Sequence, residues 1–343
     1  MPSEMPGGAG GFSPLRVSPG GAGFFRPLRS RREADLDGRV TLDPRGNLSD
    51  VRRFSHQAMA TVYEVYASHA DQRYVAQAAQ AAFDLVDRLE QELSRFLPNS
   101  DITRVNRLAA GECVRVTPTT LECLAIARHM FDLTGGAFDV SLRTGLPSLE
   151  LDPDESLVLA TTAGVRLDLG GIGKGYAVDL MAEVLEEWGL SAALVHGGFS
   201  SVLALDAPPG HDGWPLTLSD PGVPSRELAR LSIRQTALGA SGVRKGDHIL
   251  DPSTGTPVRT RLGAWASVPR PRDPVPELVA GLEPRAAAGA VTDALATAFM
   301  LLSDEDIEQL CEGSPGLEAW IADAPTTESG AGTRWRHFGR GAR

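Results

Sequence analysis

A glycine-rich segment at residues 167–179, LDLGGIGKGYAVD, combines residue types that bind phosphate groups. Closely spaced glycines surround Lys174, and Asp168 precedes them. The spacing fits neither a P-loop nor the dinucleotide-binding fingerprint. The apolar run before the glycines predicts a strand, and a helical pattern follows them. The segment therefore predicts a turn that links a strand to a helix N-terminus, where free N–H groups attract anions. A purely structural turn is the alternative interpretation.

The use of lysine in this chain favours phosphate binding. Lysine occurs only twice, at Lys174 and Lys245, among 33 lysine and arginine residues. A sequence that uses arginine for nearly every positive charge therefore places one of its two lysines in the glycine turn. Lysine carries a compact charge on a flexible stem, which suits contact with a phosphate group.

A candidate metal site lies in the apolar segment AVTDALATAFMLLS at residues 290–303, which predicts a buried helix. Asp293 and Thr297 are four residues apart, so both side chains lie on one face of this helix. A buried carboxylate is costly unless it is paired or binds a cation, and the hydroxyl adds a second oxygen ligand for Mg²⁺ or Ca²⁺. Alternatively, Asp293 complements the helix dipole and Thr297 bonds back to a carbonyl.

A candidate acid–base group, His248, lies in the polar segment ASGVRKGDHILDPSTG at residues 240–255. An imidazole exchanges protons near neutral pH. Most histidines are structural, but this segment also supplies Ser241 and Lys245, which favours a functional role.

The elements around these candidates mix helices and strands without a regular βαβ pattern. Alternating residues predict a strand over 61–67, and amphipathic patterns predict helices over 75–95 and 117–136. Short strands are expected between residues 192 and 251. The sequence therefore predicts an α+β fold.

Composition narrows the class of protein. The chain has 343 residues and a net charge of −11, which argues against nucleic-acid binding. It contains no apolar run long enough to span a membrane, and no signal peptide is recognisable at residue 1. Three cysteines without metal-like spacing predict reduced thiols, and we expect a cytoplasmic protein without excluding export by another route.

Three regions are expected along the chain. Residues 1–50 are rich in Gly, Pro and Arg and predict a disordered tail, whose arginines are solvated or contact an acidic partner or a membrane surface. Residues 51–322 predict the folded domain, and residues 323–343 a flexible C-terminal tail.

Six segments in this order resemble the motifs of the ApbE-like flavin transferases. They are HQAMATVYEV, LSRFLPNSDITRVN, TGGAFDV, LDLGGIGKGYAVD, ASGVRKGDHILDPSTGTPV and VTDALATAFMLL, and they span roughly residues 54–305. The resemblance implies mixed or antiparallel sheets with flanking helices in two packed subdomains. It also implies an Mg²⁺-dependent reaction in which a Thr or Ser hydroxyl of an acceptor protein attacks FAD, retains FMN and releases AMP.

The resemblance assigns roles to individual residues. His248 is the candidate base. The implied metal ligands are Asp293, Thr297 and the carbonyls of Gly171 and Ala296. The implied FAD-binding residues are Met59, Phe96, Ala137, Phe138, Asp139, Asp168, Lys174 and Leu250.

Two departures from the family pattern leave other functions open. Members typically have Met-Gly-Thr where this chain has Met59-Ala60-Thr61, and the segment between the Phe-Asp motif and the glycine turn, residues 140–167, is shortened. The shortening could open the FAD pocket or change acceptor recognition. An Mg²⁺-dependent FAD pyrophosphatase and a non-catalytic FAD-binding protein are therefore the alternatives. The sequence identifies neither the acceptor nor the oligomeric state.

Overall fold

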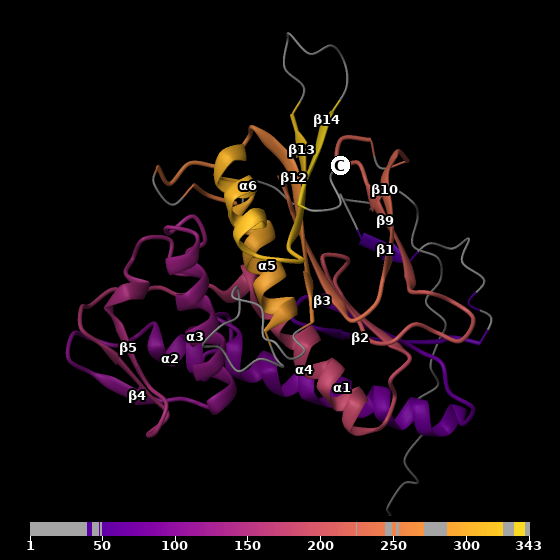
Figure 1. Cartoon of the computed structure of the whole chain (residues 1–343). Coiled ribbons are helices and arrows are strands. Elements are labelled where there is room, and N and C mark those ends of the chain that lie inside the picture. The colour runs from indigo at the N-terminus through magenta and orange to yellow at the C-terminus, as the bar shows by residue number, and fades with distance from the viewer. Residues whose placement is uncertain are drawn as a thin grey trace, which may run out of the picture. The chain divides into compact units, whose positions relative to one another are not determined.

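Every strand pair among the described residues is antiparallel, and helices lie against the sheets (Figure 1). The computed structural model describes residues 40–42, 48, 50–223, 225–243, 249–251, 254–270, 287–324 and 333–339. This arrangement confirms the α+β prediction. In the part of the chain so described, no helix is both long and apolar enough to cross a membrane.

The strands form three sheets. The largest has the order β14-β13-β12-β11-β8-β7-β3-β2, and two three-stranded sheets have the orders β1-β9-β10 and β4-β6-β5. The strands are β1 (Val40–Leu42), β2 (Arg52–Ala58), β3 (Thr61–Ala67), β4 (Cys113–Arg115), β5 (Leu149–Asp152), β6 (Leu157–Ala160), β7 (Ala193–Gly197), β8 (Ser201–Ala204), β9 (Trp214–Ser219), β10 (Glu227–Ile233), β11 (Thr236–Gly242), β12 (Arg261–Pro269), β13 (Glu318–Asp323) and β14 (Arg334–Phe338).

Several helices follow a residue whose side chain accepts hydrogen bonds from the N–H groups of the first helical turn. The helices are α1 (Gln72–Leu93), α2 (Asp101–Val105), α3 (Pro118–Leu133), α4 (Gly173–Glu187), α5 (Ala288–Ala298) and α6 (Asp304–Gly313). Asp71 caps α1, Ser100 caps α2 and Thr117 caps α3. Neither α4 nor α5 has a capping side chain of its own; Asp293 on α5 accepts from the Gly175 N–H of α4, and Asp179 on α4 accepts from the Gly289 N–H of α5.

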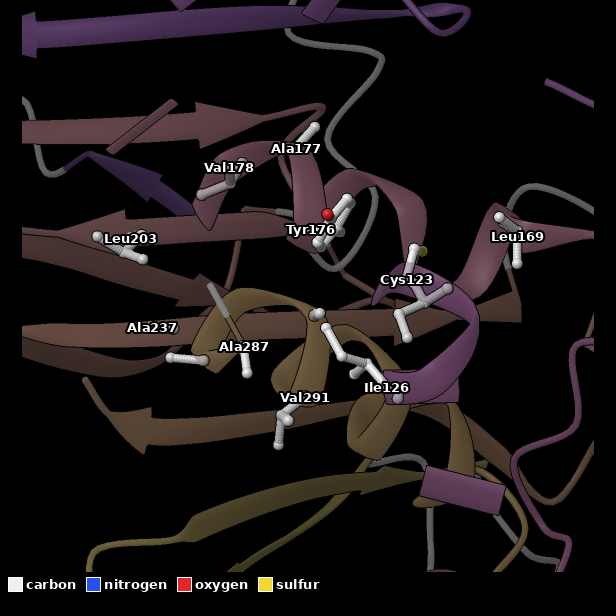
Figure 2. Packing of buried hydrophobic residues seen from close by; sticks show 14 of the residues in the cluster. Cys123, Ile126, Leu169, Tyr176, Ala177, Val178, Leu203, Ala237, Ala287 and Val291 are labelled. Carbon is white, nitrogen blue, oxygen red and sulfur yellow. The ribbon is translucent and has the colours of Figure 1, made fainter. Parts of the chain in front are cut away.

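The large sheet separates two apolar cores because its side chains alternate between its faces. On β12, Ala264 and Ala266 belong to the core on the helical side, whereas Trp265 belongs to the core shared with β9 and β10. Figure 1 shows α5 on one side of β12 and β13, and β9 and β10 on the other. Figure 2 shows side chains from α3, α4, α5, β8 and β11 gathered in the first core.

Two segments that were expected to be tails contain strands. Val40–Leu42 pairs with β9, and Arg334–Phe338 pairs with β13. The second strand is held by an edge-to-face contact between Trp335 and Trp265, whose ring centroids are 5.3 Å apart. An aromatic residue from a distant strand therefore orders a segment whose own composition predicts flexibility.

Candidate functional site

The glycine turn and α5 meet at one cavity of about 280 Å³. Asp168 and the single 3₁₀ turn Leu169–Gly171 lead into α4. The helix α5, from a distant part of the sequence, contacts both this turn and α4. Asp168 accepts a hydrogen bond from the N–H of Gly170 at 3.0 Å and thereby fixes the turn. The strand predicted before the turn is not regular, but the turn and the helix N-terminus are present as expected.

Nine of the predicted site residues line this cavity. They are Ala137, Phe138, Asp139, Asp168, Gly171, Lys174, Leu250, Asp293 and Thr297. Three others are not among its lining residues: Met59 accepts from the Tyr63 hydroxyl at 3.2 Å, Phe96 is 77% exposed, and Ala296 is buried. His248 and Lys245 lie outside the described residues.

Asp293 is a buried carboxylate held by two hydrogen-bond donors and a nearby ammonium group. Its oxygens accept from the Ser201 hydroxyl at 2.7 and 2.9 Å and from the Gly175 N–H at 2.8 Å. The ammonium of Lys174 lies 3.7 Å from Oδ2 and also donates to the Gly170 carbonyl at 3.2 Å. Burial raises the pKa of Asp293, and Lys174, Ser201 and Gly175 oppose this rise.

The donor set beside Asp293 suits a hard cation. Thr297 Oγ1 donates to the Asp293 carbonyl at 3.1 Å, as the alternative interpretation expected, and lies 3.0 Å from Ser241 Oγ. A Cβ on Gly171 would lie 3.4 Å from the same Thr297 oxygen. The amide of Met300, which would bond to the Ala296 carbonyl in a continued helix, donates to the Thr297 carbonyl at 3.2 Å instead. One carboxylate, one hydroxyl and the carbonyl that Met300 leaves at the end of α5 are oxygen ligands of the type that Mg²⁺ prefers.

Close backbone contact brings the two helices to the cavity. A Cβ on Gly175 would lie 2.0 Å from the Gly289 carbonyl oxygen, so only glycine allows α4 and α5 to approach this closely. Asp179 on α4 accepts from the N–H groups of Gly289 and Ala290 at 2.7 and 2.9 Å. Since Asp293 on α5 accepts from Gly175 on α4, each helix caps the other, four residues after its own glycine.

Asp139 organises the loop that forms another wall. It accepts from the N–H and hydroxyl of Ser141 at 2.8 and 2.7 Å and from the N–H of Arg143 at 2.7 Å. The shortened segment that follows contains the β5–β6 hairpin and pairs with β4. Its first residues, Val140 and Leu142, line the cavity, so the shortened segment keeps a wall there.

Two of the site residues that sequence reasoning missed shape the site directly. Ser201 binds Asp293 directly from β8, and Phe199, in the turn before β8, lines the cavity with a φ of 62°. A left-handed conformation is unusual for an aromatic residue and occurs where the surrounding fold holds it. The only signal in the sequence was the segment GGFSS, whose glycines indicated a turn without indicating what it faces.

Ala60, which stands where the family pattern has glycine, lies in a turn with unusual backbone angles. Met59 and Ala60 form the turn between β2 and β3 with φ values of 48° and 57°. The family pattern places glycine at the second position, where a left-handed conformation costs least. This chain keeps the turn with an alanine.

The fold and this oxygen-lined cavity define an α+β protein with a cation-compatible site between the N-terminus of α4 and the C-terminal half of α5. The sequence profile of the ApbE family matches residues 59–145 and 141–270, more than half of the chain. The chain therefore belongs to the ApbE family.

Individual relatives agree with this assignment. An FAD:protein FMN transferase of Treponema pallidum is 27% identical over 324 residues, which cover 80% of this chain and 81% of the relative. The solved flavin transferase ApbE of Vibrio cholerae superposes with a TM-score of 0.69 at 19% identity, covering 84% of this chain and 97% of that one. An ApbE protein of Thermotoga maritima gives a TM-score of 0.66 at 21% identity, with coverages of 83% and 96%. These two structures share the fold.

Proposed function

We propose that the protein catalyses Mg²⁺-dependent transfer of FMN from FAD to a Thr or Ser hydroxyl of an acceptor protein, with release of AMP. The observation that carries the proposal is the convergence of Lys174, Asp293 and Thr297 on one cavity with the glycine turn. The Treponema pallidum relative, named an FAD:protein FMN transferase, supports the same chemistry.

In this proposal the glycine turn and Lys174 hold the diphosphate of FAD. The first turn of α4 presents N–H groups, and the Lys174 ammonium adds positive charge where the leaving phosphate forms. Asp293, Thr297 and the carbonyls of Gly171 and Ala296 would hold Mg²⁺. When bound, the ion would screen the charge on the diphosphate and stabilise the departing AMP.

The transfer breaks the phosphoanhydride bond of FAD and forms a phosphoester bond to the acceptor. The acceptor oxygen bonds to the FMN phosphorus, the bond from that phosphorus to the bridging oxygen breaks, and the oxygen leaves with AMP. The hydroxyl proton passes to a base, for which His248 is the candidate. Phe138 and Phe199 supply aromatic surface for a ring of the dinucleotide, as Met59 and Phe96 would if the bound ligand reaches them.

One assay separates the proposed function from its alternatives. The protein is incubated with FAD, Mg²⁺ and a peptide that carries an acceptor threonine, and products are analysed after denaturation. Flavin fluorescence on the peptide with one equivalent of AMP supports transfer, and omission of Mg²⁺ or addition of EDTA is expected to abolish it. FMN and AMP without modified peptide would identify a pyrophosphatase, and bound FAD without products a binding protein.

A further inference from the structure

A second cavity of about 440 Å³ adjoins the candidate site. It is lined by Arg95, Arg107 and Arg166 together with Leu142, Leu167 and Asp168, and we call it the arginine cleft. Leu142 and Asp168 also line the first cavity. A ligand that occupies one cavity therefore lies next to the contents of the other.

The arginine cleft carries more positive than negative charge. Its one carboxylate, Asp168, is paired with Arg95 at 2.8 Å. Arg166 donates through Nη1 to the backbone carbonyls of Asn106 and Val165, which carry no charge. Within the described ranges, the Arg107 guanidinium has no hydrogen bond or ion pair. Two guanidinium groups therefore face the cleft without an acidic partner.

The two arginines without an acidic partner extend from backbone segments that are hydrogen-bonded to each other. The Asn106 amide donates to the Leu167 carbonyl at 3.0 Å and accepts from the Leu167 N–H at 2.6 Å. This pair of hydrogen bonds joins the end of α2 to the segment before the glycine turn. Arg107 and Arg166 each lie next to one of these two residues, so both extend from the same junction.

We propose that the arginine cleft binds an acidic side chain of the acceptor protein close to the hydroxyl that is modified, an inference that rests on the proposed function. A chain with a net charge of −11 repels acidic partners as a whole, so a local positive cleft beside the site favours docking of such a partner there. Guanidinium groups match carboxylates through paired hydrogen bonds. In the proposed function the diphosphate of FAD is held by Lys174 and the glycine turn, which line the first cavity and not the arginine cleft.

Direct peptide binding tests the proposal without requiring turnover. Two labelled peptides share an acceptor threonine, and one carries two aspartates beside it where the other carries asparagines. Fluorescence anisotropy is measured with FAD and EDTA present. The wild-type protein is expected to bind the aspartate peptide about 5-fold more tightly, as two partly exposed ion pairs allow, with a smaller difference at high salt.

Substitutions test whether Arg107 and Arg166 cause the preference for the aspartate peptide. Arg107→Gln combined with Arg166→Gln is expected to bind both peptides equally, with unchanged affinity for FAD. The matched control Arg73→Gln changes an exposed arginine on α1 and is expected to keep the 5-fold preference. If the double variant unfolds, Arg107→Glu alone provides the test, because it should prefer a peptide with lysines in place of the aspartates.

Several outcomes would overturn the proposal. Equal binding of both peptides by the wild type would do so even if flavinylation occurs. Loss of FAD affinity in the double variant with an unchanged peptide preference would assign the cleft to the nucleotide. If no peptide is flavinylated but the preference and its loss in the double variant are observed, the proposed function fails and the cleft remains an acidic-peptide site.

Discussion

At the scale of single residues, Asp293 is the group on which the candidate chemistry depends. Replacement by asparagine keeps its shape and one acceptor for the Gly175 N–H, but removes the charge that would hold a divalent ion. We expect Asp293→Asn to lower Mg²⁺-dependent turnover by more than about 100-fold, beyond the range seen for groups that only orient metal ligands. Turnover is measured at increasing Mg²⁺ with thermal unfolding as the folding control. Wild-type rates at saturating Mg²⁺ would remove Asp293 from the metal site.

Ser201 is expected to act through Asp293. Its hydroxyl donates to both carboxylate oxygens, so Ser201→Ala leaves the carboxylate less well oriented and less stabilised as an anion. The Mg²⁺ concentration for half-maximal turnover should rise about 10- to 100-fold, whereas the rate at saturating Mg²⁺ should change little. A fall in the saturated rate with an unchanged Mg²⁺ requirement would contradict this positioning role.

A site residue could be predicted from the sequence only where its type is unusual for the segment in which it lies. Asp293, Thr297 and Lys174 could be selected because a carboxylate in an apolar helix and a rare lysine among glycines are unusual in themselves. Ser201 could not, because a serine beside a strand is common and its importance arises from a contact 92 residues away in the sequence. Phe96 lies exposed against Arg95, which no local pattern indicates.

At the scale of elements, α4 and α5 are joined by a glycine contact. In Gly175→Ala the new methyl group would lie 2.0 Å from the Gly289 carbonyl oxygen, so the helices must separate. We expect a loss of about 3 kcal/mol or more in the free energy of unfolding, at the upper end for overpacked sites. The matched control is Gly173→Ala, whose Cβ would meet only Leu169 at 3.8 Å and should change stability by about 1 kcal/mol or less. Equal effects of the two substitutions in urea unfolding would show that the contact is not tight.

The cap that Asp179 provides for α5 makes stability depend on pH. Burial raises the pKa of Asp179 to about 8, although the N–H groups of Ala290 and Gly289 and the charge of Arg270 lower it. Because the native state holds its proton more tightly than the unfolded chain, this contribution is fully present below about pH 4 and is lost as pH rises through about 8. Relative to Asp179→Asn, which does not titrate, the wild type should therefore lose stability between about pH 5 and pH 9.

Urea unfolding at several pH values measures this dependence. The difference in free energy of unfolding between the wild type and Asp179→Asn is expected to shift against the wild type as pH rises. A pH-independent difference would mean that Asp179 is ionised in the native state throughout this range, with its two N–H donors outweighing burial.

Helices and strands were predicted correctly where the hydrophobic periodicity of a single segment identifies them. The strand over 61–67 coincides with β3, and the helix expected over 75–95 is α1 at Gln72–Leu93. The long strand β12 was missed, because RLGAWASVP is buried on both faces and has no alternation to detect. The mutual capping of α4 and α5 was also not predictable, since each aspartate satisfies a helix more than 100 residues away.

At the scale of the whole molecule, strands near both chain ends extend the sheets beyond the predicted limits of 51–322. Val40–Leu42 adds an edge to β9, and Arg334–Phe338 adds one to β13. We therefore propose that the transferase domain includes these strands. Their contribution to stability comes from side chains that reach the core behind β12.

Trp335 tests whether the C-terminal strand belongs to the domain. Its partly buried ring meets the fully buried Trp265 edge to face, and Arg336 on the same strand pairs with Asp323 at 2.7 Å. Trp335→Ala should cost about 2 kcal/mol, less than a fully buried tryptophan, and should lower the unfolding temperature by several degrees. The neighbouring exposed Arg334→Ala serves as the control and should change stability by about 0.5 kcal/mol or less. If both variants unfold like the wild type, residues 334–338 contribute nothing to the folded domain and the tail predicted from composition would be the better description.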